Sequence, residues 1–220
     1  MKPSNRKTPL PFRPALILAT SCLLWLSSLL PVVAGSSASA ATSGAPAATG
    51  TGATSEARLV ESVRRGGVTI LIRHSATEPG VGDPPGFNLT DCASQRNLND
   101  AGREQARRLG RWFEANGLRP TAVRVSPWCR ARETAMLAFG QSQDWIPLSN
   151  LLSDRTRQVE QTRAVRDAIV AGADGTIDVL VSHGVSISAF VDVYLRQGEM
   201  VVVRRAGDGG IEIVGQLLVP

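Results

Sequence analysis

Histidine is scarce in this 220-residue sequence, in which only His74 and His183 are present. No cluster of acidic residues stands at metal-ligand spacing, so the sequence lacks the ligands of a two-metal hydrolytic site. It also lacks a glycine-rich phosphate loop, and its three cysteines form no CxxC pair of the kind found in zinc or redox motifs. We therefore expect no metal and no cofactor.

Lysine is equally scarce, and both lysines belong to a basic N-terminal segment that precedes a long apolar stretch at 15–34. The Ala38-Ser39-Ala40 pattern that follows is typical of a signal peptidase site. The sequence predicts a cleaved signal peptide over residues 1–40, a mature start at Ala41, and a periplasmic or secreted protein without a stable membrane anchor. The alternative is an uncleaved anchor, because the apolar stretch is about long enough to span a bilayer.

Without this segment, the excess of positive charge nearly disappears. All 19 acidic residues lie beyond residue 40, whereas four of the 24 basic residues lie before it, so the net charge falls from +5 to +1. A basic surface for nucleic acid is therefore not expected. Residues 41–56 consist almost wholly of small residues and proline, which is typical of a disordered linker, and residues 57–220 remain for one folded domain.

Two cysteines, Cys92 and Cys129, remain in the predicted mature chain. In an oxidising compartment a lone pair of cysteines is more often bridged than free. We expect a Cys92–Cys129 disulfide, with two buried reduced cysteines as the alternative.

The two histidines each come shortly after a largely apolar, β-branched run, at 68–72 and 177–181. Such runs are typical of parallel strands covered on both faces, and ligands bind at the carboxyl ends of such strands. Alternating strands and amphipathic helices predict a three-layer α/β/α sandwich with a mostly parallel sheet. A further short strand is expected at 146–148 and a helix at about 185–195. The Pro/Gly-rich segment after His74, residues 75–97, is expected to be a lid or a substrate-facing loop.

Four motifs in this sequence resemble those of the histidine phosphatase superfamily, branch 1, whose fold is phosphoglycerate mutase-like. They occur in the family's order: Leu71-Ile72-Arg73-His74-Ser75-Ala76-Thr77, Leu98-Asn99-Asp100-Ala101-Gly102-Arg103-Glu104-Gln105-Ala106, Ser126-Pro127-Trp128-Cys129-Arg130-Ala131-Arg132-Glu133-Thr134-Ala135 and Val181-Ser182-His183-Gly184. The signal sequence and the Gly82-Asp83-Pro84-Pro85-Gly86 loop are more similar to the small exported phosphatases of this superfamily than to its glycolytic mutases.

The resemblance implies a role for each residue of a phosphoryl site. His74 is expected to be the nucleophile that forms a phosphohistidine, and His183 to stabilise the phosphoryl oxygens. Arg73 and Arg130 are expected to bind phosphate, since guanidinium groups match its oxygens and stay charged. Surface ion pairing is the alternative role for both arginines.

The general acid that protonates the leaving group is the least determined residue. Many members of the family carry a Leu-x-Glu sequence in this region, and here Leu152-Ser153-Asp154 occupies it. Asp154 is the first candidate, and Glu78 and Asp83 in the loop after His74 are the alternatives. Asp154 is equally suited to a helix N-terminus.

These features predict an exported, metal-independent phosphomonoester hydrolase. Its substrate would be a small phosphorylated molecule such as an envelope sugar phosphate. A phosphoglycerate mutase-like phosphotransferase is one alternative. The other is a non-catalytic phosphate- or sugar-phosphate-binding protein on the same scaffold.

Overall fold

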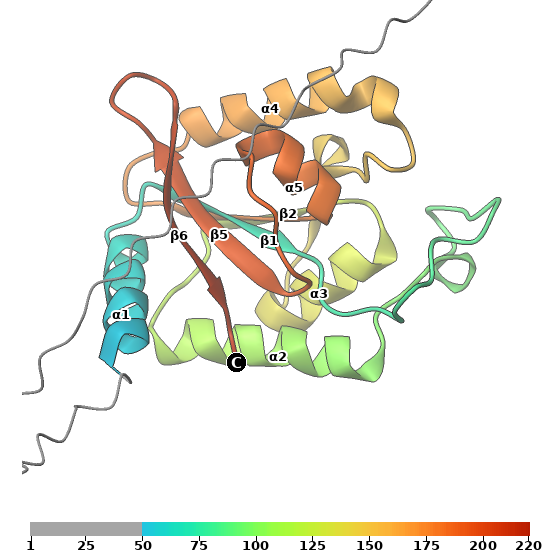
Figure 1. The fold of residues 1–220 in the computed structure, drawn as a ribbon, viewed down its shortest axis with the longest axis horizontal. Coiled ribbons are helices and arrows are strands. Elements are labelled where there is room, and N and C mark those ends of the chain that lie inside the picture. Colours follow the sequence, from blue (N-terminus) through green and yellow to red (C-terminus); the bar gives the residue numbers. More distant parts are fainter. Residues whose placement is uncertain (1–49) are drawn as a thin grey trace, which may run out of the picture. The chain divides into compact units, whose positions relative to one another are not determined.

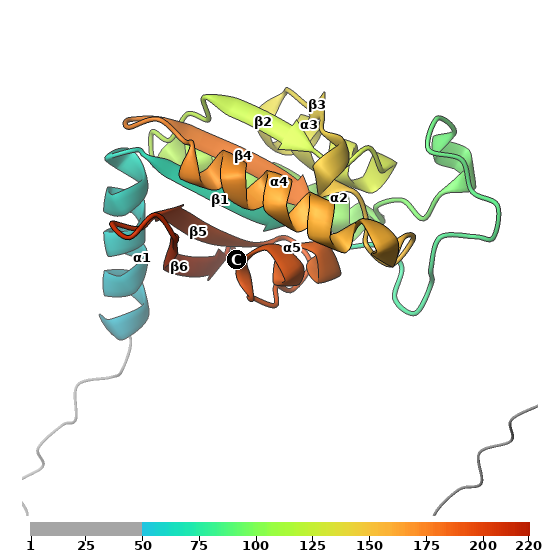
Figure 2. The same cartoon turned by 90° about the horizontal axis from the view of Figure 1, so that it is seen from above.

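The computed structural model describes residues 50–220. The predicted signal peptide (1–40) and residues 41–49 of the predicted linker lie outside the described residues. The described chain forms one six-stranded sheet in the order β3-β2-β4-β1-β5-β6, with helices on both faces (Figures 1 and 2). No helix of residues 50–220 is both long enough and apolar enough to cross a membrane.

The sheet and its helices alternate along the chain. The strands are β1 (Val68–Arg73), β2 (Ala122–Val125), β3 (Gln143–Asp144), β4 (Ile177–Ser182), β5 (Glu199–Arg205) and β6 (Ile211–Leu218). The α-helices are α1 (Gly50–Arg64), α2 (Asp100–Ala115), α3 (Cys129–Phe139), α4 (Gln158–Val170) and α5 (Gly184–Val191). Three short 3-10 turns are η1 (Cys92–Ser94), η2 (Ile146–Leu148) and η3 (Arg155–Arg157).

Strands β3, β2, β4 and β1 are parallel, and β5 and β6 add an antiparallel hairpin. This confirms the predicted α/β sandwich with a mostly parallel sheet. Strands β1 and β4 are neighbours, and Arg73 pairs in register with Ser182. The carboxyl ends of the two strands therefore meet at one edge of the sheet, and the residues that follow them are brought together.

Each face of the sheet has its own apolar core. On one face, Ile70 and Ile72 of β1 pack with residues of α1, α2 and α3. On the other face, Leu71 packs with residues of α4 and α5. Figure 1 shows the sheet between α4 and α2. Because both faces are covered, every β1 side chain from Val68 to Ile72 is buried, which explains the largely apolar run.

The structure differs from the sequence-based expectations at three places. The segment 146–148 is the 3-10 turn η2 and not a strand, and the short strand β3 lies just before it. Helix α5 ends at Val191 and not near residue 195, because Asp192 takes a left-handed conformation (φ 56°). Helix α1 begins at Gly50, so residues 50–56 are helical where the sequence indicated a linker. Its Leu59 and Val63 are buried against the sheet and anchor the helix.

Candidate active site

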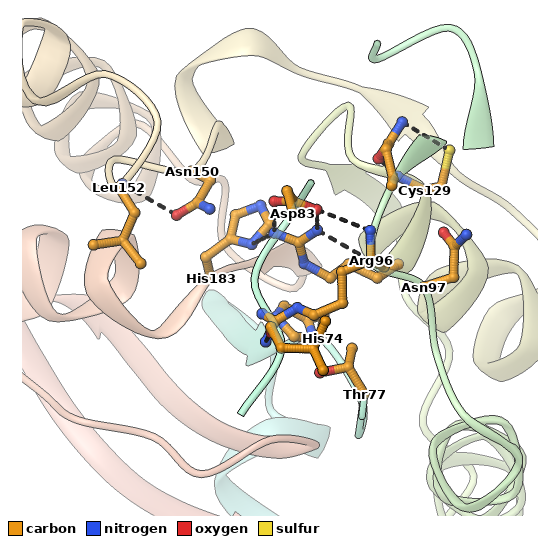
Figure 3. A network of polar contacts seen from close by, with 12 residues as sticks. His74, Thr77, Asp83, Arg96, Asn97, Cys129, Asn150, Leu152 and His183 are labelled. Atoms are coloured by element: carbon orange, nitrogen blue, oxygen red, sulfur yellow. Dashed lines mark hydrogen bonds and ion pairs between the residues drawn. The ribbon is translucent and has the colours of Figure 1, made fainter. Parts of the chain in front are cut away.

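The two histidines of the chain lie side by side at the carboxyl ends of β1 and β4. The His74 backbone N–H donates to the carbonyl oxygen of Ser182 (2.9 Å), and the ring centroids of His74 and His183 are 5.3 Å apart. Both side chains are buried, with 2% and 3% of their surface exposed. Figure 3 shows both rings facing the same group of polar side chains. Adjacent parallel strands thus create the site.

The His74 ring presents one nitrogen that can act as a nucleophile. Nδ1 lies 2.8 Å from the carbonyl oxygen of Ser75, and because a carbonyl can only accept, Nδ1 carries the proton. In the neutral ring, Nε2 then has the free electron pair. Burial, reinforced by the positive charge of Arg130, lowers the pKa of His74 from 6.5 to about 3. At neutral pH the ring is therefore unprotonated at Nε2.

His183 is fixed in the opposite tautomer. Its Nδ1 lies 3.4 Å from Nη2 of Arg130, which can only donate, so Nδ1 is the acceptor. Nε2 therefore carries the proton and donates to Oγ of Ser126, 2.7 Å away. Burial, the neighbouring His74 and the arginine charges lower the pKa of His183 well below 6.5. The ring of Trp128 packs edge-on against His183, with the centroids 5.4 Å apart.

The backbone that follows His74 is held by two helices. The N–H of Ser75 donates to Oγ1 of Thr134 on α3 (3.0 Å), and the N–H of Ala76 donates to Oε1 of Gln105 on α2 (3.1 Å). Gly102 on α2 faces the Ala76 carbonyl so closely that a Cβ there would lie 2.0 Å from the oxygen. The second and third sequence motifs therefore position the segment that carries His74.

Arg73 lies across the start of α5. Its Nη1 donates to the carbonyl oxygen of Leu195 (2.8 Å) and lies 3.4 Å from the hydroxyl of Tyr194, and its Nε is buried without a hydrogen-bond partner among the described residues. A Cβ at Gly184 would lie 3.2 Å from the guanidinium, so the glycine leaves room for it. Arg73 thus keeps one buried N–H free to bind a ligand.

Arg130 is fully buried and holds an acidic side chain of the 75–97 loop. Its Nη1 donates to Oδ1 of Asp83 (2.8 Å), and its Nη2 donates to Oδ2 (3.1 Å). Its Nε is buried without a partner among the described residues. Burial lowers the pKa of Arg130, and the Asp83 carboxylate opposes this shift. A buried guanidinium with a free N–H is suited to bind an anion.

Arg96 is a third arginine of the site, and it lies outside the four sequence motifs. Its backbone N–H donates to Oδ1 of Asp83 (3.0 Å), and its Nη1 donates to the carbonyl oxygen of Val81 (2.6 Å). Its charge also lowers the pKa values of His74 and His183. Arg96 is the only arginine in residues 75–97, and this is the one feature of the sequence that could have placed it in the site.

The three candidate acids lie in different surroundings. Asp83 contacts the arginines, and Glu78 is exposed in the same loop. Asp154 is exposed and caps η3, where it accepts from the N–H (3.0 Å) and the hydroxyl (2.6 Å) of Thr156. The Thr156 hydroxyl is the larger cause that lowers the pKa of Asp154. Of the three candidates, only Asp83 is brought onto the arginines.

The same segment of the chain also carries an amide, that of Asn150. The Leu-x-polar spacing also occurs at Leu148-Ser149-Asn150, and Asn150 is buried. The Ser182 hydroxyl donates to the Leu148 carbonyl (2.7 Å), and the Ser186 hydroxyl donates to the Ser149 carbonyl (2.9 Å). In Figure 3 the Asn150 amide lies on the side of the His183 ring. The sequence contains this pattern twice, at 148–150 and at 152–154, and local spacing does not distinguish the two.

The predicted Cys92–Cys129 disulfide is present and joins the 75–97 loop to the start of α3. Gln95 strengthens the same junction, because its Oε1 accepts from the N–H of Cys129 (3.0 Å). The far half of the loop is therefore tied next to Arg130. Among residues 50–220, no group of three or more His, Cys, Asp or Glu side chains is arranged to hold a metal ion.

Comparisons with known proteins agree with this geometry. Residues 69–156 match the family model of the histidine phosphatase superfamily (branch 1), while no curated protein matches the sequence. The structure is similar to the protein histidine phosphatase SixA complexed with tungstate (13% identity, 69% of this chain and 96% of that chain, TM-score 0.50). It is also similar to phosphoserine phosphatase from Entamoeba histolytica with 3-phosphoglyceric acid (16%, 68% and 95%, TM-score 0.52). A mycobacterial glucosyl-3-phosphoglycerate phosphatase is a further structural neighbour (14%, 66% and 96%, TM-score 0.50).

At these identities the structural likenesses show the fold, which is that of phosphoglycerate mutase-like phosphatases. By the family model over residues 69–156 and by its fold, the chain is similar to the histidine phosphatase superfamily, branch 1.

Proposed function

We propose that the protein is an exported, metal-independent phosphomonoester hydrolase that acts through a phosphohistidine on His74. The observation that carries the proposal is the tautomer of His74. Its Nδ1–H is bound to the Ser75 carbonyl, so that Nε2 is free and unprotonated. The charges of Arg130 and Arg73 act on His74, and each of these arginines has a buried Nε–H without a partner among the described residues. A nucleophile next to fixed positive charge is what a phosphomonoester dianion requires.

The reaction takes place in two steps. In the first, Nε2 of His74 attacks phosphorus, an N–P bond forms, and the bond from phosphorus to the ester oxygen breaks. Arg73 and Arg130 balance the charge on the phosphoryl oxygens. In the second step, water attacks phosphorus, the N–P bond breaks, and His74 returns to its neutral form as inorganic phosphate leaves.

The surroundings of the leaving group favour some esters over others. Asp154 is exposed and its pKa is lowered, and the Asn150 amide has no acidic proton to give. Asp83 accepts three hydrogen bonds from Arg130 and Arg96, as a carboxylate does. Hydrolysis is therefore expected to be fastest for esters whose leaving group departs without a proton, such as aryl phosphates.

A small phosphorylated molecule is the proposed substrate. Structural neighbours are named as phosphatases of phosphoserine and of glucosyl-3-phosphoglycerate, which are both small. The apolar stretch and the Ala38-Ser39-Ala40 pattern support export, which favours a substrate of the cell envelope, such as a sugar phosphate. Export is tested by N-terminal sequencing of the protein from the periplasm or medium. A start at Ala41 is expected, and an intact Met1 would contradict it.

The test of the activity is an acid quench after brief mixing with nitrophenyl phosphate in the presence of a chelator. Wild type is expected to turn over and to carry one acid-labile phosphoryl group by intact mass, and His74→Ala is expected to show neither. Transfer to an added acceptor alcohol in preference to water would indicate a mutase. Phosphate binding without any adduct or turnover would indicate a binding protein and overturn the proposal.

A further inference from the structure

The 75–97 loop supplies an anion of its own to the proposed phosphate site. The Asp83 carboxylate is bound by both terminal nitrogens of Arg130 and by the backbone N–H of Arg96. The Arg130 side chain is 1% exposed and that of Asp83 is 10% exposed, so the pair is shielded from water. Figure 3 shows Asp83 beside His183 and above His74. An internal carboxylate thus lies where a phosphoryl group would meet Arg130.

The geometry points to Asp83 as a specificity-determining residue, whose carboxylate must be replaced on Arg130 by the substrate's phosphoryl group. Two carboxylate oxygens on a guanidinium fork match two phosphoryl oxygens on the same fork, so both cannot occupy it. This inference rests on the proposed function, because it requires that Arg130 binds the phosphoryl group.

The near half of the loop is held to the site by Asp83 and by the bond from Arg96 to the Val81 carbonyl, whereas a disulfide fixes the far half. Gly80 and Gly86, on either side of Asp83, have φ values of +72° and +76°. A Cβ at either position would meet nothing within 4 Å, so the packing around them is open. The Cys92–Cys129 disulfide holds the far half next to α3. In Figures 1 and 2 the loop extends away from the edge of the sheet. Asp83 can therefore leave Arg130 without unfolding of the domain.

Because Asp83 already occupies Arg130, a ligand must make more hydrogen bonds than a carboxylate does in order to replace it. A free carboxylate would make the same bonds to Arg130 as Asp83, yet it would lose translational freedom on binding. A phosphoryl group has a third non-bridging oxygen, and the buried Nε groups of Arg73 and Arg130 have no partner among the described residues. Phosphoryl groups can use these extra donors, whereas simple carboxylates cannot reach them all. Asp83 thereby excludes weak anions.

The first test is the binding of inorganic phosphate to the whole mature protein by titration calorimetry. Asp83→Asn and Asp83→Ala are expected to bind phosphate on the order of tenfold more tightly than wild type, because neither variant has a carboxylate that must be displaced from Arg130. Glu78→Gln removes the same charge from the same loop without touching Arg130, and less than a threefold change is expected. Equal or weaker binding by both Asp83 variants, or an equal gain in Glu78→Gln, would overturn the inference.

The second test asks whether a small carboxylate can take the vacated position. Acetate is expected to raise the melting temperature of Asp83→Ala and to leave that of wild type unchanged. The amide oxygen of Asp83→Asn can still accept a hydrogen bond from Arg130. This variant is therefore used in the same measurement if Asp83→Ala does not fold. The same measurement with phosphate is expected to stabilise both variants more than wild type. No stabilisation of either variant by phosphate would contradict the inference.

A third measurement uses wild type alone. Hydrogen exchange of the amides at 80–87 is expected to become faster when phosphate binds, since the near half of the loop is released. Slower exchange there would show that the loop closes over the ligand with Asp83 in place. These readouts are independent of the acid quench. If phosphate releases the loop but no phosphoenzyme forms, the proposed hydrolase is refuted and the inference about Asp83 stands. If a phosphoenzyme forms but phosphate does not release the loop, the inference alone is refuted.

Discussion

At the scale of single residues, the chemistry of the site depends on which nitrogen of each histidine carries the proton. The Ser75 carbonyl fixes the proton of His74 on Nδ1, and Arg130 fixes that of His183 on Nε2. The two rings are therefore not equivalent. His74 presents a free electron pair, while both nitrogens of His183 are already engaged. This difference supports His74 as the nucleophile.

The first prediction concerns the pH dependence of catalysis. Because the pKa of His74 is lowered to about 3, this proposed nucleophile stays unprotonated in the free protein throughout the range from pH 5 to 7. For nitrophenyl phosphate, kcat/KM is expected to stay level within about twofold over this range after correction for the substrate's own ionisation. A steady-state pH profile checks this. An acidic limb with an apparent pKa near 6.5 would show that His74 is not shielded from water in the working enzyme.

The second prediction concerns Asp154. Its carboxylate is exposed and bound within its own turn by Thr156, so Asp154→Asn is expected to change kcat/KM by less than about threefold for alkyl and aryl phosphates alike. The measurement is the ratio of kcat/KM for the alkyl phosphate to kcat/KM for the aryl phosphate, compared between wild type and Asp154→Asn. A selective loss of about a hundredfold for the alkyl phosphate, with the aryl phosphate spared, would assign the general acid to Asp154.

The sequence predicted the positions of the site residues better than their contacts. His74, His183, Arg73 and Arg130 all lie in motifs at the ends of elements. In the structure the two histidines are adjacent, and both arginine charges act on them. Arg96 lies in an irregular loop, whose path no periodicity predicts. The bond between Asp83 and Arg130 joins residues 47 positions apart, so it follows from the folded loop and not from local spacing.

At the scale of elements, the start of α2 is what positions the segment after His74. Gly102 and Gln105 lie on the face of this helix that meets Ala76. Asn99 caps the helix by accepting from the N–H of Gly102 (2.8 Å). A glycine in a first helical turn is costly in backbone entropy, and here the close approach of the Ala76 carbonyl explains it.

The third prediction compares two glycines of the same helix. A Cβ at Gly102 would lie 2.0 Å from the Ala76 oxygen, and one at Gly110 would lie 2.4 Å from the Ala138 oxygen. Each alanine variant is expected to lose about 1–3 kcal/mol of unfolding free energy from overpacking. Only Gly102→Ala is also expected to lose kcat, by about tenfold or more, because it displaces the segment that carries the nucleophile.

Urea unfolding and steady-state kinetics at a temperature where both variants are folded separate these effects. An equal change of kcat in the two variants would mean that α2 acts only through overall stability. Normal kcat in Gly102→Ala would mean that the Ala76 backbone can shift without moving His74.

Element prediction from the sequence succeeded where packing repeats regularly and failed where a single residue ends an element. The apolar runs of β1 and β4 predicted buried parallel strands, because both faces of the sheet are covered. The end of α5 depends on one left-handed residue, Asp192, which carries no strong signal. The 3-10 turn at 146–148 contains Pro147, and its apolar residues are equally compatible with a short strand.

At the scale of the whole molecule, the site is assembled from distant parts of the chain at the carboxyl ends of β1 and β4. Its histidines sit in the interior and not in an open cleft, and both are held neutral there. This arrangement couples the chemistry of the site to the stability of the fold. An unfolded chain would protonate both rings near pH 6.5, whereas the folded chain resists protonation.

The last prediction is a loss of stability in mild acid. In both histidines the folded pKa is lower than the unfolded value, so between these values the unfolded state binds more protons. The free energy of unfolding is then unaffected above pH 6.5 and decreases as the pH falls below it. For two such histidines the decrease between pH 6.5 and 5.0 is up to about 3 kcal/mol, in a range where most carboxylates remain ionised. Urea unfolding at fixed salt checks this, and His74→Gln is expected to show about half the decrease, because one of the two proton-binding groups is gone. If wild type were equally stable at pH 6.5 and 5.0, the histidines would be accessible to water and protons in the folded protein.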